Sequence, residues 1–243
     1  MASGMANHLA NTKSNALMNH ATRVLASTLG LLVGIGSIEH GLLECLQGYR
    51  PTPGVIVDAL AAGYRWTAWK DGGEGAFTLI PNFLITGLVA TLLGVLIILW
   101  SLWRLHARSG AAIFLILGMA SFLTGGGVAQ IALIVFTWAV ATCIHGSLAF
   151  WRRAIPRRLR RVIATFWPWT LGASVLLFLA ALEIAVLGYA PGIRNESEVL
   201  HIGWAVLAMA LALYLVSVGS GLARDIEAQS ASAGMKTSCS ADP

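Results

Sequence analysis

The sequence predicts an all-α protein: a polytopic bundle of six membrane-spanning helices with both termini in the cytoplasm. Of its 243 residues, 57% are hydrophobic and only 11% are charged, and the mean hydropathy is +0.74. A soluble domain carries about 25% charged residues. The chain therefore holds more apolar surface than a water-soluble fold can bury, and its length is best counted in spans of about 20 apolar residues.

Six apolar stretches follow one another along the chain. The expected spans cover residues 24–48, 83–103, 111–124, 128–150, 166–190 and 201–222. Together they form a membrane domain at 24–222 with an outer loop at 49–81. We expect a cytoplasmic N-terminal segment at 1–23 and a polar, disordered cytoplasmic tail at 223–243.

The third expected span, 111–124, is short for a membrane crossing. Its 14 residues cover only about 21 Å, whereas the hydrocarbon core is about 30 Å thick. A re-entrant hairpin is the alternative, and the run Gly125-Gly126-Gly127 is expected to turn the chain into the next span. Charge favours a full crossing, because cytoplasmic loops carry the excess of Lys and Arg. Without this span, Arg104 and Arg108 would face the opposite side from the later arginine cluster.

The formal net charge of +5 raises the question of nucleic-acid binding. The basic residues lie in short segments between apolar stretches, where anionic lipid head groups are the nearer partner. We therefore expect a multi-pass protein of the plasma or inner membrane that binds no nucleic acid and contacts anionic lipid at its inner face. The arginines expected to contact lipid are Arg152, Arg153, Arg157, Arg158, Arg160 and Arg161.

Small residues recur at helical spacing in three of the expected spans. Lipid tails are as apolar as leucine, so membrane helices associate largely through close backbone approach at such residues. We expect three stripes to face the bundle interior. They are Gly30, Gly34, Ser37, Gly41, Glu44 and Gly48 in the first span, Gly87, Thr91, Gly94 and Ser101 in the second, and Ala205, Ala208, Ala212 and Gly219 in the last.

Glu39, Glu44 and Glu183 lie inside expected spans, which contain no Lys or Arg in their interiors. Ionisable residues at membrane depth are costly and are candidates for function by default. His40 and Glu44 are four residues apart, so their side chains project from one helix face. The predicted topology places Glu44 and Glu183 at a similar depth in the outer half of the bilayer.

The candidate site follows from these depths. We expect a cavity open to the outer side, lined by Glu44, His40, Glu183, Gln130 and His201. Carboxylates without a basic partner favour protons, metal cations or cationic solutes over anions. The outer loop at 49–81 is expected to lie over this site, either as a lid or as an ordinary surface loop.

Three functions remain open at this point. The leading hypothesis is a transporter or permease-like protein with a proton- or cation-linked site. The alternatives are an accessory subunit whose acidic residues make interhelical hydrogen bonds, and a metal or haem protein that uses His40, Glu44 and His201. The chain lacks the HExxH, P-loop, dinucleotide and nucleophile-elbow motifs, so no enzymatic reaction, metal or cofactor is identified. The sequence leaves the oligomeric state open.

Overall fold

The computed structural model describes residues 18–58 and 75–239, with side chains up to residue 232, and is mostly helical. The helices are α2 (His20–Cys45), α4 (Phe83–Trp103), α5 (Gly110–Leu123), α6 (Gln130–Thr142), α7 (Ala149–Ala154), α8 (Arg157–Ile163), α9 (Trp167–Leu187) and α10 (Glu196–Cys239). A short 3-10 helix, η1 (Cys143–His145), continues α6. The strands are β1 (Ile56–Asp58), β2 (Gly75–Thr78) and β3 (Thr124–Gly127).

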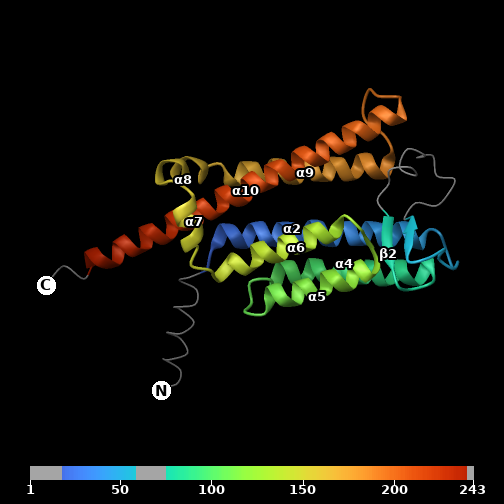
Figure 1. Cartoon of the computed structure of the whole chain (residues 1–243), viewed down its shortest axis with the longest axis horizontal. Helices are drawn as coiled ribbons and strands as arrows, with labels where there is room; N and C mark the ends of the chain where they lie inside the picture. The colour runs from blue at the N-terminus through green and yellow to red at the C-terminus, as the bar shows by residue number, and fades with distance from the viewer. Residues whose placement is uncertain (1–17, 59–74, 240–243) are drawn as a thin grey trace, which may run out of the picture.

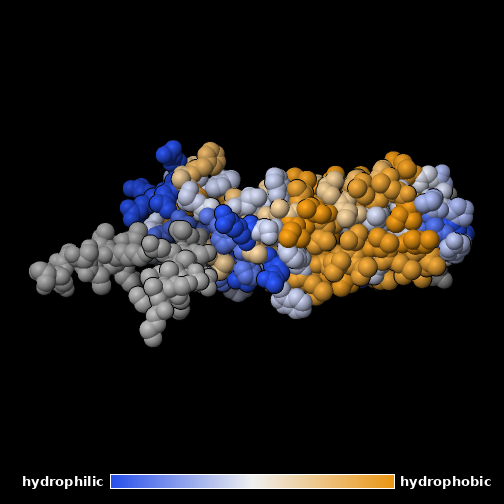
Figure 2. All heavy atoms as spheres, turned by 90° about the horizontal axis from the view of Figure 1, so that it is seen from below, coloured by the Kyte–Doolittle hydropathy of each residue, from blue (hydrophilic) through white to orange (hydrophobic). Residues whose placement is uncertain are grey.

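Within the described residues, α2, α4, α9 and α10 are long and apolar enough to cross a membrane. The helix α5 and the pair α6 and η1 are apolar but shorter. Helices α2, α4, α5 and α6 form one bundle, and α9 and α10 form a hairpin beside it (Figure 1). Figure 2 shows a broad apolar belt with hydrophilic side chains at both ends. Such a belt between polar ends is the surface that a bilayer requires.

A small antiparallel sheet, absent from the sequence prediction, closes one end of the bundle. Its strand order is β1-β2-β3, and Ala76 of β2 pairs with Gly127 of β3. The run Gly125 to Gly127 is therefore a strand and not the expected turn. The middle of the expected outer loop, residues 59–74, lies outside the described residues. The expectation that this loop forms a lid therefore lies largely outside the described residues.

The short helix α5 runs the length of the bundle with the help of β3. At one end, the indole Nε1 of Trp100 in α4 donates to the carbonyl of Gly110 at 2.9 Å. At the other end, the amide of Leu79, just after β2, donates to the carbonyl of Leu123 at 3.0 Å. Helix and strand together cover roughly 34 Å at 1.5 Å and 3.3 Å per residue. The extended segment thus supplies the length that α5 lacks.

Glycines bring the backbones of α2 and α4 into contact, as predicted for the first two stripes. A methyl group added at Gly34 would lie 2.5 Å from Cγ1 of Ile98 and 2.8 Å from the carbonyl oxygen of Gly94. One added at Gly41 would lie 2.6 Å from the carbonyl oxygen of Gly87. These helices pack more extensively on each other than any other pair. The predicted stripes of the first two spans are confirmed at these positions.

The third predicted stripe, on the last span, is wrong. The side chains of Ala205, Ala208 and Ala212 are exposed, and a methyl group at Gly219 would meet nothing within 4 Å. The other face of α10 is buried, and the Tyr214 hydroxyl on that face donates to the carbonyl of Leu25 at 3.1 Å. Helical spacing alone identifies a stripe but not the side that meets a neighbour.

The expectation of a disordered tail from residue 223 also fails, because α10 continues to Cys239. The buried carboxylate of Asp225 accepts hydrogen bonds from the amides of Ala21 and Thr22 at 2.9 and 2.8 Å, and from the Thr22 hydroxyl at 2.7 Å. Gln229 donates to Asn19 at 2.7 Å. The polar residues that suggested disorder include Asp225, which supplies a hydrogen-bond partner for the free amides at the start of α2.

The glycine contact between α2 and α4 leads to a stability prediction. We expect Gly34→Ala to lower the unfolding temperature in detergent, because the added methyl group collides with Ile98 and with the Gly94 backbone. Overpacking of this kind costs about 1–3 kcal/mol. The matched control is Gly172→Ala on α9, where an added methyl group meets nothing within 4 Å. That change should be neutral or stabilising by up to about 1 kcal/mol, through helix propensity. Equal unfolding temperatures for the two variants would contradict the packing role.

Candidate functional site

Glu44 lies in the last turn of α2 and is fully buried, with 0% of its surface exposed. Two other elements enclose its carboxyl group. A methyl group added at Gly125 of β3 would overlap Oε2 of Glu44 and would lie 2.9 Å from the hydroxyl oxygen of Thr86 in α4. The carboxyl group is therefore held between α2, α4 and the sheet that closes this end of the bundle.

The carboxyl group has few polar partners. Neither oxygen of Glu44 has a hydrogen-bond partner of good geometry among the described residues, although the Thr86 hydroxyl lies beside it. That hydroxyl is 2.6 Å from the hydroxyl of Thr78 in β2. His40, one turn earlier on α2, is close enough to interact electrostatically with the carboxylate. The site thus contains a buried carboxyl group, a pair of hydroxyls and an imidazole.

The glycine in β3 is required for this arrangement. Gly125 has a φ of +106°, a conformation that side-chain-bearing residues rarely adopt. Its lack of a side chain also lets the strand lie directly against the carboxyl group of Glu44. The sequence offered one signal for this contact, because a glycine in a strand often marks a close approach of the backbone to another group. Thr78 and Thr86 carried no such signal.

Gln130 belongs to a second buried polar cluster, which links three helices. The Ser37 hydroxyl of α2 lies 3.1 Å from Oε1 of Gln130 in α6, and it accepts a hydrogen bond from the Ser121 hydroxyl of α5 at 2.9 Å. Ser37 is seven residues from Glu44, or about 10 Å along the helix. Gln130 therefore lies one layer further into the bundle, with its side-chain oxygen already hydrogen-bonded.

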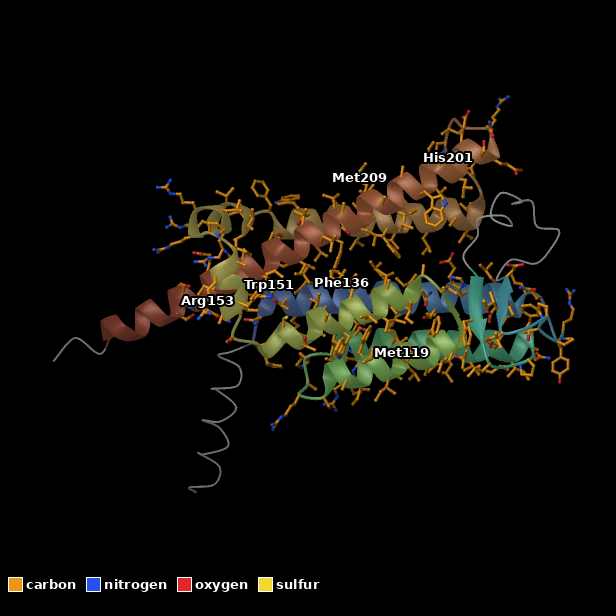
Figure 3. All side chains as sticks on the ribbon, in the orientation of Figure 1. Met119, Phe136, Trp151, Arg153, His201 and Met209 are labelled. Carbon is orange, nitrogen blue, oxygen red and sulfur yellow. The ribbon has the colours of Figure 1, made fainter. Side chains whose placement is uncertain are left out.

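Glu183 and His201, the other two predicted site residues, lie elsewhere. Both side chains are exposed, Glu183 on α9 and His201 on α10. Figure 3 shows the labelled His201 in the hairpin that lies beside the main bundle. The structure places His40 near Glu44, and it places Gln130 in the adjacent layer of the bundle. Glu183 and His201 are not enclosed with these residues. Depth along a helix does not determine which neighbour a side chain faces.

The other histidines and the metal alternative can be placed as well. Nε2 of His145 lies 2.9 Å from the carbonyl oxygen of His106, in the loop between α4 and α5. Burial, followed by the neighbouring charges of Arg23, His145 and Arg104, lowers the pKa of His106. Within residues 18–58 and 75–239, no three His, Cys, Asp or Glu side chains come together as metal ligands. The geometry therefore does not support a metal centre built from His40, Glu44 and His201.

The comparisons with known proteins add no further constraint. No protein-family model matches the chain, and no curated protein or solved structure matches it. Its function must therefore be inferred from the geometry and chemistry of its own residues.

The contact between Gly125 and Glu44 can be tested with one substitution at two glycines. We expect Gly125→Ala to destabilise the protein, because the new methyl group would overlap the Glu44 carboxyl group and would sit on a backbone of positive φ. Gly192→Ala is the control, since Gly192 also has a positive φ, +84°, but open space around it. Both variants incur the backbone cost of about 1–2 kcal/mol. Gly125→Ala should lower the unfolding temperature further than Gly192→Ala does, because only Gly125 faces the Glu44 carboxyl group. Equal decreases for the two variants would contradict this contact.

Proposed function

We propose that the protein is a membrane transporter or permease-like protein in which Glu44 binds a proton or a small cation at the outer end of the bundle. The observation that carries this proposal is the buried carboxyl group of Glu44, whose two oxygens lack hydrogen-bond partners of good geometry among the described residues. A group buried in this way is rare in folded proteins and calls for a specific explanation.

The energetics explain why such a site would take a positive charge. Burying an ionised carboxylate without a partner costs several kcal/mol, because the interior solvates charge poorly. The expected span interiors contain no Lys or Arg, so the side chain left to offset the charge there is the His40 imidazole, which is cationic only when protonated. A bound proton or cation removes the cost. The hydroxyls of Thr86 and Thr78, which lie 2.6 Å apart, offer further oxygen atoms on the same side.

We further propose six crossings with both termini in the cytoplasm, in the plasma or inner membrane. The route of α5 and β3 from the Trp100 end of α4 back to the sheet supports a full third crossing. Helices α7 and α8, which carry the six clustered arginines, lie at the end of the molecule opposite the sheet (Figure 1). Because cytoplasmic segments carry the excess of Lys and Arg, this end would be the inner one.

A structural role, as an accessory subunit, is the second candidate. The cluster of Ser37, Ser121 and Gln130 favours it, because these residues satisfy one another across three helices. Interhelical hydrogen bonds of this kind hold membrane helices together without any chemistry. Glu44 differs from this cluster, since its oxygens lack comparable partners. The two candidates therefore make different predictions for Glu44.

The topology is tested by single cysteines in a variant without native cysteines. The chosen positions are Ser109, Leu159 and Ser197, all exposed. Membrane-impermeant reagents should label the first two from the cytoplasmic side only and the third from the outside only. Labelling of Ser109 from the outside would show that α5 does not cross.

The role of Glu44 is tested with Glu44→Gln, which keeps the shape of the side chain and removes its charge and titration. We expect the variant to fold, with an unfolding temperature near that of the unmodified protein. In proteoliposomes containing a pH-sensitive dye, it should lose the proton movement that imposed Na⁺, K⁺ or Mg²⁺ gradients drive through the unmodified protein. Glu183→Gln is the control and should retain this flux, because Glu183 is exposed and outside the enclosed site.

Two results would contradict a functional Glu44. One is unchanged flux in Glu44→Gln. The other is a combination of three findings. The unmodified protein shows no gradient-driven flux, Glu44→Gln leaves the unfolding temperature unchanged, and Glu44→Leu unfolds the bundle. The second pattern is the one that a purely structural carboxyl group predicts.

A further inference from the structure

The six arginines of α7 and α8 divide into two groups with different surroundings. Arg160 is buried, and its guanidinium pairs with the Glu227 carboxylate of α10 at 2.5 Å. Arg152 donates to the side-chain oxygen of Gln229, also on α10, at 2.9 Å. These two arginines attach α7 and α8 to α10. They are therefore engaged within the protein, contrary to the expectation that all six contact lipid.

The other four arginines are free to meet a partner outside the chain. Arg153, Arg157, Arg158 and Arg161 are all exposed. The segment from Ala149 to Phe166 contains no acidic residue of its own, and the Glu227 carboxylate beside it on α10 is already paired with Arg160. Figure 3 shows the labelled Arg153 at the end of the molecule where α10 leaves the bundle. A dense positive surface results on one short segment.

Large apolar side chains lie between these arginines and are exposed as well. Phe150 is 71% exposed, Leu159 52%, Val162 58% and Phe166 54%. Apolar groups of this size are costly in water but favourable at the boundary between head groups and acyl chains. In Figure 2, hydrophilic side chains gather beside the apolar belt, at the end where α7 and α8 lie. The segment therefore combines cationic and apolar groups in the manner of a surface that rests on a membrane.

We propose that α7 and α8 form a binding surface for anionic phospholipid head groups. Arg153, Arg157, Arg158 and Arg161 bind the lipid phosphates, because the planar guanidinium donates paired hydrogen bonds to phosphate oxygens. Phe150, Val162 and Phe166 enter the acyl region beneath them. Charge complementarity selects an anionic lipid over a zwitterionic one, whose head group carries its own positive charge.

Bound lipid would also stabilise the inner end of the bundle. Arg160 and Arg152 connect this segment to α10, and Asp225 of α10 binds the first amides of α2. Lipid that holds α7 and α8 at the bilayer surface therefore also holds the end of α10 against α2. A ligand that binds only the folded state raises its stability in proportion to the logarithm of ligand concentration.

The test is thermal unfolding of the purified full chain in nanodiscs. Nanodiscs that contain phosphatidylglycerol should raise the unfolding temperature by roughly 5–10 °C over nanodiscs of phosphatidylcholine alone, the size expected for a ligand well above its dissociation constant. The variant with Arg153, Arg157, Arg158 and Arg161 all changed to Gln should lose most of this rise. The variant Arg104→Gln with Arg108→Gln is the control: it removes two exposed arginines from another loop and should keep the rise.

Several outcomes would overturn the proposal. The first is an equal unfolding temperature in the two kinds of nanodisc. The second is an equal loss of the rise in the control, which would indicate a general effect of charge. The third is full stabilisation by inorganic phosphate in detergent without phosphatidylglycerol, which would indicate a site for soluble phosphate. If the fourfold variant does not fold, the pair Arg157→Gln and Arg158→Gln replaces it, with lipid retention counted by native mass spectrometry. The pair should retain fewer phosphatidylglycerol molecules, and unchanged retention would overturn the proposal.

Discussion

The contact between α2 and α4 sets the position of most other elements in the bundle. Where Gly34 meets Gly94 and Gly41 meets Gly87, the two backbones lie close enough that a single methyl group would collide. Lipid provides no hydrophobic force between helices, so dense packing of this kind is a main source of their association. Because α2 and α4 are held together in this way, Thr86 of α4 comes beside Glu44 of α2, and β3 can pack over both.

The two ends of α2 are closed by different interactions. At its first turn, the buried Asp225 of α10 accepts hydrogen bonds from backbone amides that a helix start leaves free. At its last turn, glycine-rich β3 covers Glu44, and β2 pairs with β3. Extended backbone is tolerated beside a membrane only when its polar groups have partners within the protein. The pairing of β2 with β3 supplies such partners for part of this backbone, and β3 at the same time helps to isolate the carboxyl group of Glu44 from water.

The candidate site was partly predictable from the sequence. The spacing of His40 and Glu44 and the small residues around them indicated a carboxyl group that faces protein, and Glu44 is fully buried. The grouping with Glu183 and His201 depended on depth alone. Two side chains at one depth can point in any direction around their helices, and both of these are exposed. Thr86 and Gly125 became visible only when α4 and β3 were placed against α2.

By itself, the sequence determined the helical class, the apolar segments and the glycine face of α2, because hydrophobicity and helical periodicity are local properties of the chain. The bounds of α4, at residues 83–103, agree with the expected span. Only the tertiary structure decided that residues 124–127 form a strand, that α10 continues past residue 222, and that two of six arginines are engaged within the protein. Each of these features depends on a partner distant in the chain, such as β2 for β3 and α2 for Asp225. Local composition carries no information about such partners. The polar continuation of α10 was therefore predicted to be disordered, and the glycine-rich strand β3 was predicted to be a turn.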